Sequence, residues 1–121
     1  MNLKGYFLPS APWYMEDFIV SDLLRINGVI NAALLDDEGF VLAIANSEIE
    51  VTKDIEKIAD IDLDSKGYSR ITITSEKAIL IIDKLDSDNR LITWCEQSCN
   101  LGMIRKNLDN AVLRLNSYLG N

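Results

Sequence analysis

The chain has 121 residues, of which 48% are hydrophobic and 26% charged, as is usual for one soluble globular domain. Its formal net charge is −7 and it has no basic stripe to follow a phosphate backbone, so nucleic-acid binding is not expected. Without a secretory signal or an apolar run that could span a membrane, and with two cysteines only, we expect a cytoplasmic protein that does not insert into membranes.

The first part of the chain predicts an arm, a helix and a hairpin. Residues 1–12 contain two prolines and are expected to form an N-terminal arm, with a single domain over residues 13–121. Apolar residues at roughly helical spacing predict a helix over residues 13–26. The runs VINAALL and FVLAIANS flank the turn DDEG, in which Gly39 can take a left-handed conformation, and this pattern predicts a β-hairpin.

The residues after the hairpin predict a short amphipathic helix. Ser47 and Glu50 fit a capping box at its start, and Thr52 is a second possible cap. The apolar stripe of this helix consists of Val51, Ile55, Ile58 and Ala59.

The segment DIDLDSKG follows this helix and resembles a calcium loop in its first, third and fifth positions. An EF-hand also requires glycine at the sixth position and glutamate at the twelfth, and here these positions hold serine and isoleucine. Since aspartates are common in turns, we interpret the segment as the loop that ends the helix.

Three strands and a helix complete the chain. RITITSE alternates polar and apolar residues, which predicts a strand near an edge, whereas KAILIIDK and RLITWCE are nearly continuously apolar, as in central strands. Apolar residues at offsets of three and four predict a final helix from Leu101 to Leu119. The order α-β-β-α-β-β-β-α indicates an α+β fold.

Two cysteines stand where the last strand passes into the last helix. A zinc site needs four ligands, but the chain has no histidine and no second cysteine pair, and a redox pair needs a two-residue spacing. We therefore interpret Cys95 and Cys99 as structural, with Asn100 or Ser98 capping the helix and Gly102 allowing its close approach to the strand. No motif for a catalytic, metal or cofactor site is present, and none is expected.

The arrangement resembles the Roadblock/LC7 family over about residues 16–119. The resemblance rests, in order, on LLRINGVINAALLDDEGFVLAIANS, on SRITITSEKAILIIDKLDSDNRLITWCE and on CNLGMIRKNLDNAVLRLNSYL. The last segment is similar to the Asn-Leu-Gly-x-x-Arg opening of the family's final helix, matched by Asn100, Leu101, Gly102 and Arg105. This helix makes the chain more similar to the prokaryotic and lysosomal-scaffold members than to the dynein light chains.

The resemblance implies a five-stranded antiparallel sheet, profilin-like in form, with two helices on one face and one on the other. It also implies a non-enzymatic scaffold that regulates a Ras-like small GTPase and dimerises, with itself or with a second Roadblock protein, through the middle helix and the edge of the third strand. The candidate interface residues are Val51, Ile55, Ile58, Ala59, Arg70, Thr72 and Thr74.

The negative charge is concentrated in one part of the chain, with ten acidic residues and two lysines between Asp36 and Asp64. Such a patch suits a basic partner, although solubility alone would explain it equally well. The candidate partner-binding residues are Glu48, Glu50 and Glu56. The alternative function is a ligand-sensing or signalling module, because PAS, GAF and longin-type domains have a similar organisation; a sensor would need a roomy polar pocket between the sheet and the helices.

Overall fold

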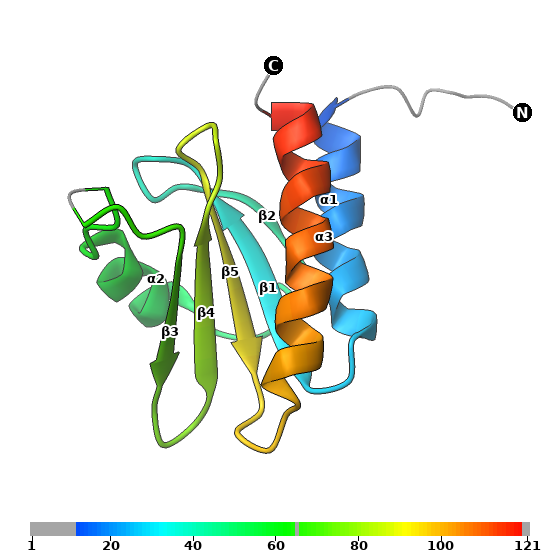
Figure 1. Ribbon diagram of the computed structural model, residues 1–121, viewed down its shortest axis with the longest axis vertical. Coiled ribbons are helices and arrows are strands. Elements are labelled where there is room, and N and C mark those ends of the chain that lie inside the picture. The colour runs from blue at the N-terminus through cyan, green and yellow to red at the C-terminus, as the bar shows by residue number, and fades with distance from the viewer. Residues whose placement is uncertain (1–11, 65, 120–121) are drawn as a thin grey trace, which may run out of the picture.

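The computed structural model describes residues 12–64 and 66–119 (Figure 1). The expected N-terminal arm therefore lies outside the described residues, apart from Pro12, with which the first helix begins. The elements are α1 (Pro12–Asp22), the 3₁₀ helix η1 (Leu23–Arg25), β1 (Val29–Leu35), β2 (Val41–Ile44), α2 (Thr52–Ala59), β3 (Arg70–Thr74), β4 (Ile79–Lys84), β5 (Arg90–Cys95) and α3 (Leu101–Leu119).

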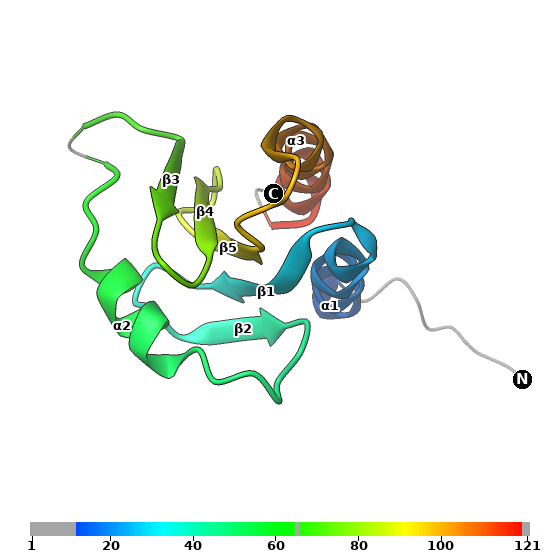
Figure 2. The same cartoon turned by 90° about the horizontal axis from the view of Figure 1, so that it is seen from below.

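The strands form one antiparallel sheet in the order β2-β1-β5-β4-β3. The helices α1 and α3 lie side by side on one face of this sheet, and α2 lies on the other (Figure 2). The predicted element order and the α+β fold with two helices on one face are confirmed. The prediction that RITIT is an edge strand is also confirmed, since β3 ends the sheet.

The sheet is covered on both faces, which explains the nearly continuous apolar runs of its central strands. One core lies under α1 and α3, and its fully buried members include Ile19, Leu34, Ile81, Leu91, Ile104 and Leu108. The other lies under α2, and its fully buried members include Leu35, Ile58, Leu63, Ile82 and Ile92. Successive residues of each central strand belong to different cores because side chains alternate across a strand.

The β1–β2 hairpin forms as predicted. One carboxylate oxygen of Asp36 accepts hydrogen bonds from the backbone N–H groups of Glu38 and Phe40, each at 2.9 Å. Gly39 has a φ of 93°, the left-handed conformation expected for it. The β1–β2 pairing shifts between Leu34 and Leu35, which introduces a bulge beside the turn.

The predicted capping box of α2 is wrong. The helix begins at Thr52, and its N-cap is Val51, whose side chain makes no capping hydrogen bond. Ser47 lies too far before the helix to cap it, because residues 46–49 form a turn in which the N–H of Ile49 donates to the carbonyl of Asn46. Instead of bonding back to Ser47, Glu50 accepts a hydrogen bond from the N–H of Thr52 at 2.5 Å.

The joint between β5 and α3 is structural, but its close approach is not at Gly102. Asn100 caps the helix by accepting a hydrogen bond from the N–H of Met103 at 3.1 Å. A Cβ on Gly102 would meet only the side-chain oxygen of Asn100, at 3.5 Å. A Cβ on Gly28 would lie 2.7 Å from the Cβ of Cys99. The required glycine therefore precedes β1, where it faces the loop that follows β5.

Replacing Gly28 with alanine should lower the free energy of unfolding by roughly 1–3 kcal/mol, because the new methyl group meets Cys99 and the φ of 95° disfavours a side chain. Gly102→Ala is the matched control, and we expect it to change stability by less than about 1 kcal/mol. Urea denaturation of both variants measures the difference. Equal costs for the two substitutions would contradict the assignment of the close contact to Gly28.

The two thiols differ in their surroundings. Cys95 is fully buried, whereas Cys99 is half-buried. Burial, with a smaller contribution from the neighbouring Cys99, raises the pKa of Cys95 to about 12. A thiol with so high a pKa is almost wholly protonated at neutral pH, and the thiolate is the form that reacts.

Maleimide should therefore leave Cys95 unmodified in the native protein at pH 7.5 and label it after unfolding in guanidinium. Mass spectrometry of the labelled peptides gives the rate at each cysteine, and Cys99 serves as the internal reference. Labelling of native Cys95 as fast as in the unfolded chain would contradict its place in the core.

Among the described residues, no helix combines the length and the apolar character that crossing a bilayer requires.

Candidate interaction surfaces

The strand β3 leaves one side of the sheet open. In the described part of the chain its only paired neighbour is β4, so the backbone groups on its outer side lack a strand partner. Ile71 and Ile73 are half-buried and pack against the core under α2. Because side chains alternate along a strand, Arg70, Thr72 and Thr74 point to the opposite face, the face of α3.

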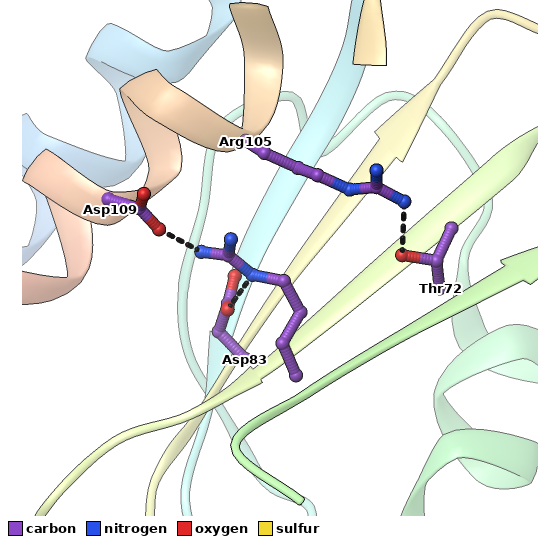
Figure 3. A network of polar contacts seen from close by, with 5 residues as sticks. Thr72, Asp83, Arg105 and Asp109 are labelled. Carbon is purple, nitrogen blue, oxygen red and sulfur yellow. Dashed lines mark hydrogen bonds and ion pairs between the residues drawn. The ribbon is translucent and has the colours of Figure 1, made fainter. Parts of the chain in front are cut away.

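Polar contacts hold β3 to α3 (Figure 3). The Nε of Arg70 donates to Asp83, which lies directly across from it on β4, and an Nη2 of Arg70 lies 2.9 Å from a carboxylate oxygen of Asp109 on α3. One turn earlier on the helix, Arg105 donates to the hydroxyl of Thr72 at 3.3 Å. The side chains of Arg70 and Thr72 are therefore engaged within the protomer, while Thr74 is exposed.

Asp83 is the buried member of this network. It is 3% exposed, and one of its carboxylate oxygens has no hydrogen-bond partner. Burial raises its pKa, and the hydrogen bond and charge of Arg70 oppose that rise. A groove of about 390 Å³ between β3, β4 and α3 runs beside the network and is lined by Ser69, Arg70, Asp83, Lys84, Asp109, Val112 and Leu113.

The candidate residues of α2 fall into two groups. Val51 and Ile58 are 7% and 1% exposed, and their side chains pack on the protomer's own sheet. Ile55 is half-buried and Ala59 is exposed. The helix has eight residues only, so most of its apolar stripe is used to cover the sheet. An interface through α2 would therefore use Ile55 and Ala59.

Local hydrogen bonds place the acidic candidates beside β2. The buried side chain of Asn31 on β1 bonds both the N–H and the carbonyl of Asn46, at 2.9 and 3.1 Å. Asn46 in turn accepts from the N–H of Glu48 at 3.0 Å. Hydrogen bonds from Thr52, more than any other cause, lower the pKa of Glu50. Both glutamates are exposed, and Glu50 is charged at neutral pH.

A groove of about 330 Å³ is lined by residues of β2, of α2 and of the loop between them, and both Glu48 and Glu50 belong to its lining. Its lining includes the apolar side chains of Val41, Ile44, Ile49 and Ile55. Glu56 is exposed on α2 and does not line the groove. Two of the three acidic candidates thus line one groove together with apolar residues of β2 and α2.

Sequence reasoning missed two features of these surfaces. The ion network of Arg70 and its two carboxylate partners was not predicted from the sequence. The signal for it was Asp83, a carboxylate within the apolar run ILIIDK. The exposure of Phe40, Val41 and Leu42 could not be read from the apolar run FVLAI, because it follows from the position of β2 at an edge. Among the described residues, no three histidine, cysteine or carboxylate side chains are placed to share a metal ion.

Comparison by sequence gives no relatives: no protein-family model matches the chain, and no curated protein matches it.

Comparison by structure gives several clear matches. A Roadblock/LC7 domain from Streptomyces avermitilis has a TM-score of 0.70 and 16% identity, covering 87% of this chain and 98% of that one. The gliding protein MglB from Thermus thermophilus has a TM-score of 0.78 and 19% identity, covering 93% and 94%. A structure described as MglB with tetrameric arrangement has a TM-score of 0.77 and 19% identity, covering 93% of each chain.

Proposed function

The chain has a Roadblock/LC7-type fold, and on that basis we propose that it is a non-catalytic, dimeric adaptor that binds and regulates a Ras-like small GTPase. The single observation that carries the proposal is the open edge of β3, which lies beside half-buried isoleucines of its own strand. The resemblance supplies the class of partner. One of the similar structures, an MglB, has a tetrameric arrangement, which supports self-association in proteins of this fold.

The dimer would be built on β3 and α2. Pairing of β3 with its copy satisfies the backbone groups that the edge leaves open and extends the sheet across both protomers. Ile71 and Ile73 on β3 supply half-buried apolar surface on the α2 face of that junction, and α2 would contribute Ile55, which in the protomer lines the groove beside β2. Arg70 and Thr72 would support the edge from the other face through their bonds to α3.

Glu48, Glu50 and Glu56 remain the proposed contact for a basic face of the GTPase. All three side chains are exposed, so their carboxylates are hydrated in the free protein and can attract a basic partner from solution. Charge attraction of this kind chiefly raises the rate of association and weakens with salt. Substituting glutamine at all three should slow GTPase binding and leave the dimer intact.

A ligand sensor is the second candidate, and the groove beside the ion network is the observation that favours it. Most residues that line that groove are polar or charged, and it lies between the sheet and a helix, as a sensor requires. However, Arg70 already bonds two carboxylates there, so its charge is largely satisfied by the protein itself.

Calorimetry distinguishes the two candidates. The purified protein is titrated with a Ras-like GTPase from the same organism, loaded either with GDP or with a non-hydrolysable GTP analogue. We expect binding whose affinity differs between the two nucleotide states and weakens as salt rises. Absence of heat with both forms, together with a small molecule retained through purification, would favour the sensor.

A further inference from the structure

The second edge of the sheet carries an unusual run of exposed apolar residues. Within the described residues β2 pairs with β1 alone, so its outer side has no strand partner. Phe40, Val41 and Leu42 follow one another at this edge and are 67%, 47% and 44% exposed. Exposed edge strands are normally protected by charged residues or proline within them, and β2 contains neither.

The apolar run continues into the groove below β2. Val41 lies opposite Leu35, and Ile44 lies opposite Ala33; both of these β1 residues belong to the core under α2. Directly opposed residues of neighbouring strands point to the same face. Val41 and Ile44 therefore face the groove of about 330 Å³, whose lining also includes Ile49 and Ile55. An additional strand at this edge could place side chains in that groove.

Carboxylates bracket the edge. Asp37 and Glu38 lie in the turn before β2, and Glu48 and Glu50 lie after it, all of them exposed. No lysine or arginine occurs anywhere between Asp36 and Glu50. The edge thus has an apolar centre and negative charge at both ends.

We propose that the edge of β2 binds an extended segment of another protein, which pairs with β2 as a sixth strand, places aliphatic side chains in the groove and carries lysine or arginine on both sides of them. Main-chain pairing and alternate side-chain pockets are how exposed sheet edges recognise extended peptides. The charges favour this partner over a second copy of the chain, because pairing β2 with its copy would bring the same carboxylates together.

The edge of β2 is separate from the edge of β3 on which the proposed dimer is built. β2 and β3 lie at opposite ends of the sheet, so a segment on β2 leaves β3 free (Figure 2). The inference goes beyond the proposed function, because it adds a peptide partner at a strand edge that the dimer leaves open. The groove beside β2 also contains Ile55, Glu48 and Glu50, so a segment that fills it would share these residues with the proposed dimer and GTPase contacts.

The probes are synthetic peptides with a core of alternating valine and threonine, flanked by two lysines at each end or by two glutamates at each end. Titration into the 121-residue protein is followed by fluorescence anisotropy, and amide hydrogen exchange locates the contact. We expect the lysine-flanked peptide to slow exchange along β2 but not along β3, and to bind about tenfold or more tightly than the glutamate-flanked peptide. A proline in the peptide core should abolish binding, because it removes a main-chain donor.

Variants of the protein test the surface itself. Val41→Lys should weaken the lysine-flanked peptide about tenfold or more, and the double substitution Glu48→Gln with Glu50→Gln should weaken it and reduce its salt dependence. Leu113→Lys on α3 is the matched control, since this leucine is 68% exposed and lies away from β2; it should bind as the unaltered protein does. If circular dichroism shows that Val41→Lys does not fold, the double variant Glu48→Gln with Glu50→Gln provides the test of the surface.

Three results would overturn the proposal. The first is that the lysine-flanked peptide fails to bind at millimolar concentration or binds no better than the glutamate-flanked one. The second is binding that leaves the β2 amides unprotected. The third is slow exchange along the outer side of β2 in the free protein, which would mean that the chain's own residues or a second copy already cover this edge.

Discussion

Replacing Arg70 with methionine should lower the free energy of unfolding by about 3–5 kcal/mol at neutral pH, because it leaves the buried carboxylate of Asp83 without its cation. The same change removes the contact from β3 to Asp109 on α3. Asp109→Asn is the matched control, because that carboxylate is 65% exposed and its pair with Arg70 should contribute less than about 1 kcal/mol. Chemical denaturation of the two variants gives the comparison.

The cost of Arg70→Met should also depend on pH. Burial raises the pKa of Asp83 in the folded protein above its usual value, and the loss of Arg70 removes the interaction that opposes the rise. A raised folded pKa means that the folded state gains stability, relative to the unfolded state, as pH falls through that pKa. The difference between the variant and the unaltered protein should therefore shrink between pH 7 and pH 4.

A second substitution tests whether the loss comes from the unpaired charge. Arg70→Met combined with Asp83→Leu removes both charges and should restore much of the stability, since replacing a buried ion pair by apolar residues is often neutral. A cost of Arg70→Met no greater than that of Asp109→Asn, or a double variant less stable than the single one, would contradict the role given to the network.

Ile55→Asp should convert the proposed dimer to a monomer without unfolding the protomer. Ile55 is half-buried in the protomer and lies on α2, where the dimer would bury it fully. An unpaired carboxylate in an apolar interface costs several kcal/mol, and each 1.4 kcal/mol weakens association about tenfold. Sedimentation velocity at micromolar concentration measures the change, and circular dichroism checks the fold.

Two other substitutions serve as controls for Ile55→Asp. Ile58→Asp places the same charge at a residue that is 1% exposed, and we expect it to unfold the protomer itself. Phe40→Asp places it at the β2 edge, where the side chain is 67% exposed, and should leave both the fold and the dimer unchanged. Loss of the dimer in Phe40→Asp but not in Ile55→Asp would mean that the dimer forms through β2, which would contradict an interface on β3 and α2.

The strands and their environments could be predicted from the sequence because each has a clear pattern. RITIT alternates and lies at an edge, whereas the continuous apolar runs of β4 and β5 lie between two covered faces. The cap by Asn100 was one of two alternatives, and the hydrogen bond to Met103 selects it. The strand patterns and the helix cap depend on residues that are close together along the chain, so a single sequence is enough to predict them.

The features that the sequence did not predict depend on tertiary contacts. The close approach of Gly28 to Cys99 joins segments about seventy residues apart, and nothing near Gly102 could indicate that the contact lies elsewhere. Arg70 and Asp83 meet because of the β3–β4 register, and Asp109 joins them because of the position of α3. Likewise, the packing of α2 on the sheet buries Val51 and Ile58 and leaves Ala59 exposed, which the apolar stripe alone could not distinguish.

The mass of the protein in solution tests the central claim most directly, since the proposed adaptor is built on a dimer through the open edge of β3. Light scattering on a size-exclusion column at micromolar concentration should give about twice the chain mass of 13.6 kDa. Hydrogen exchange on the same sample should show slow exchange along β3 at that concentration and faster exchange on dilution. A single species of 13.6 kDa with rapidly exchanging β3 amides would contradict the account.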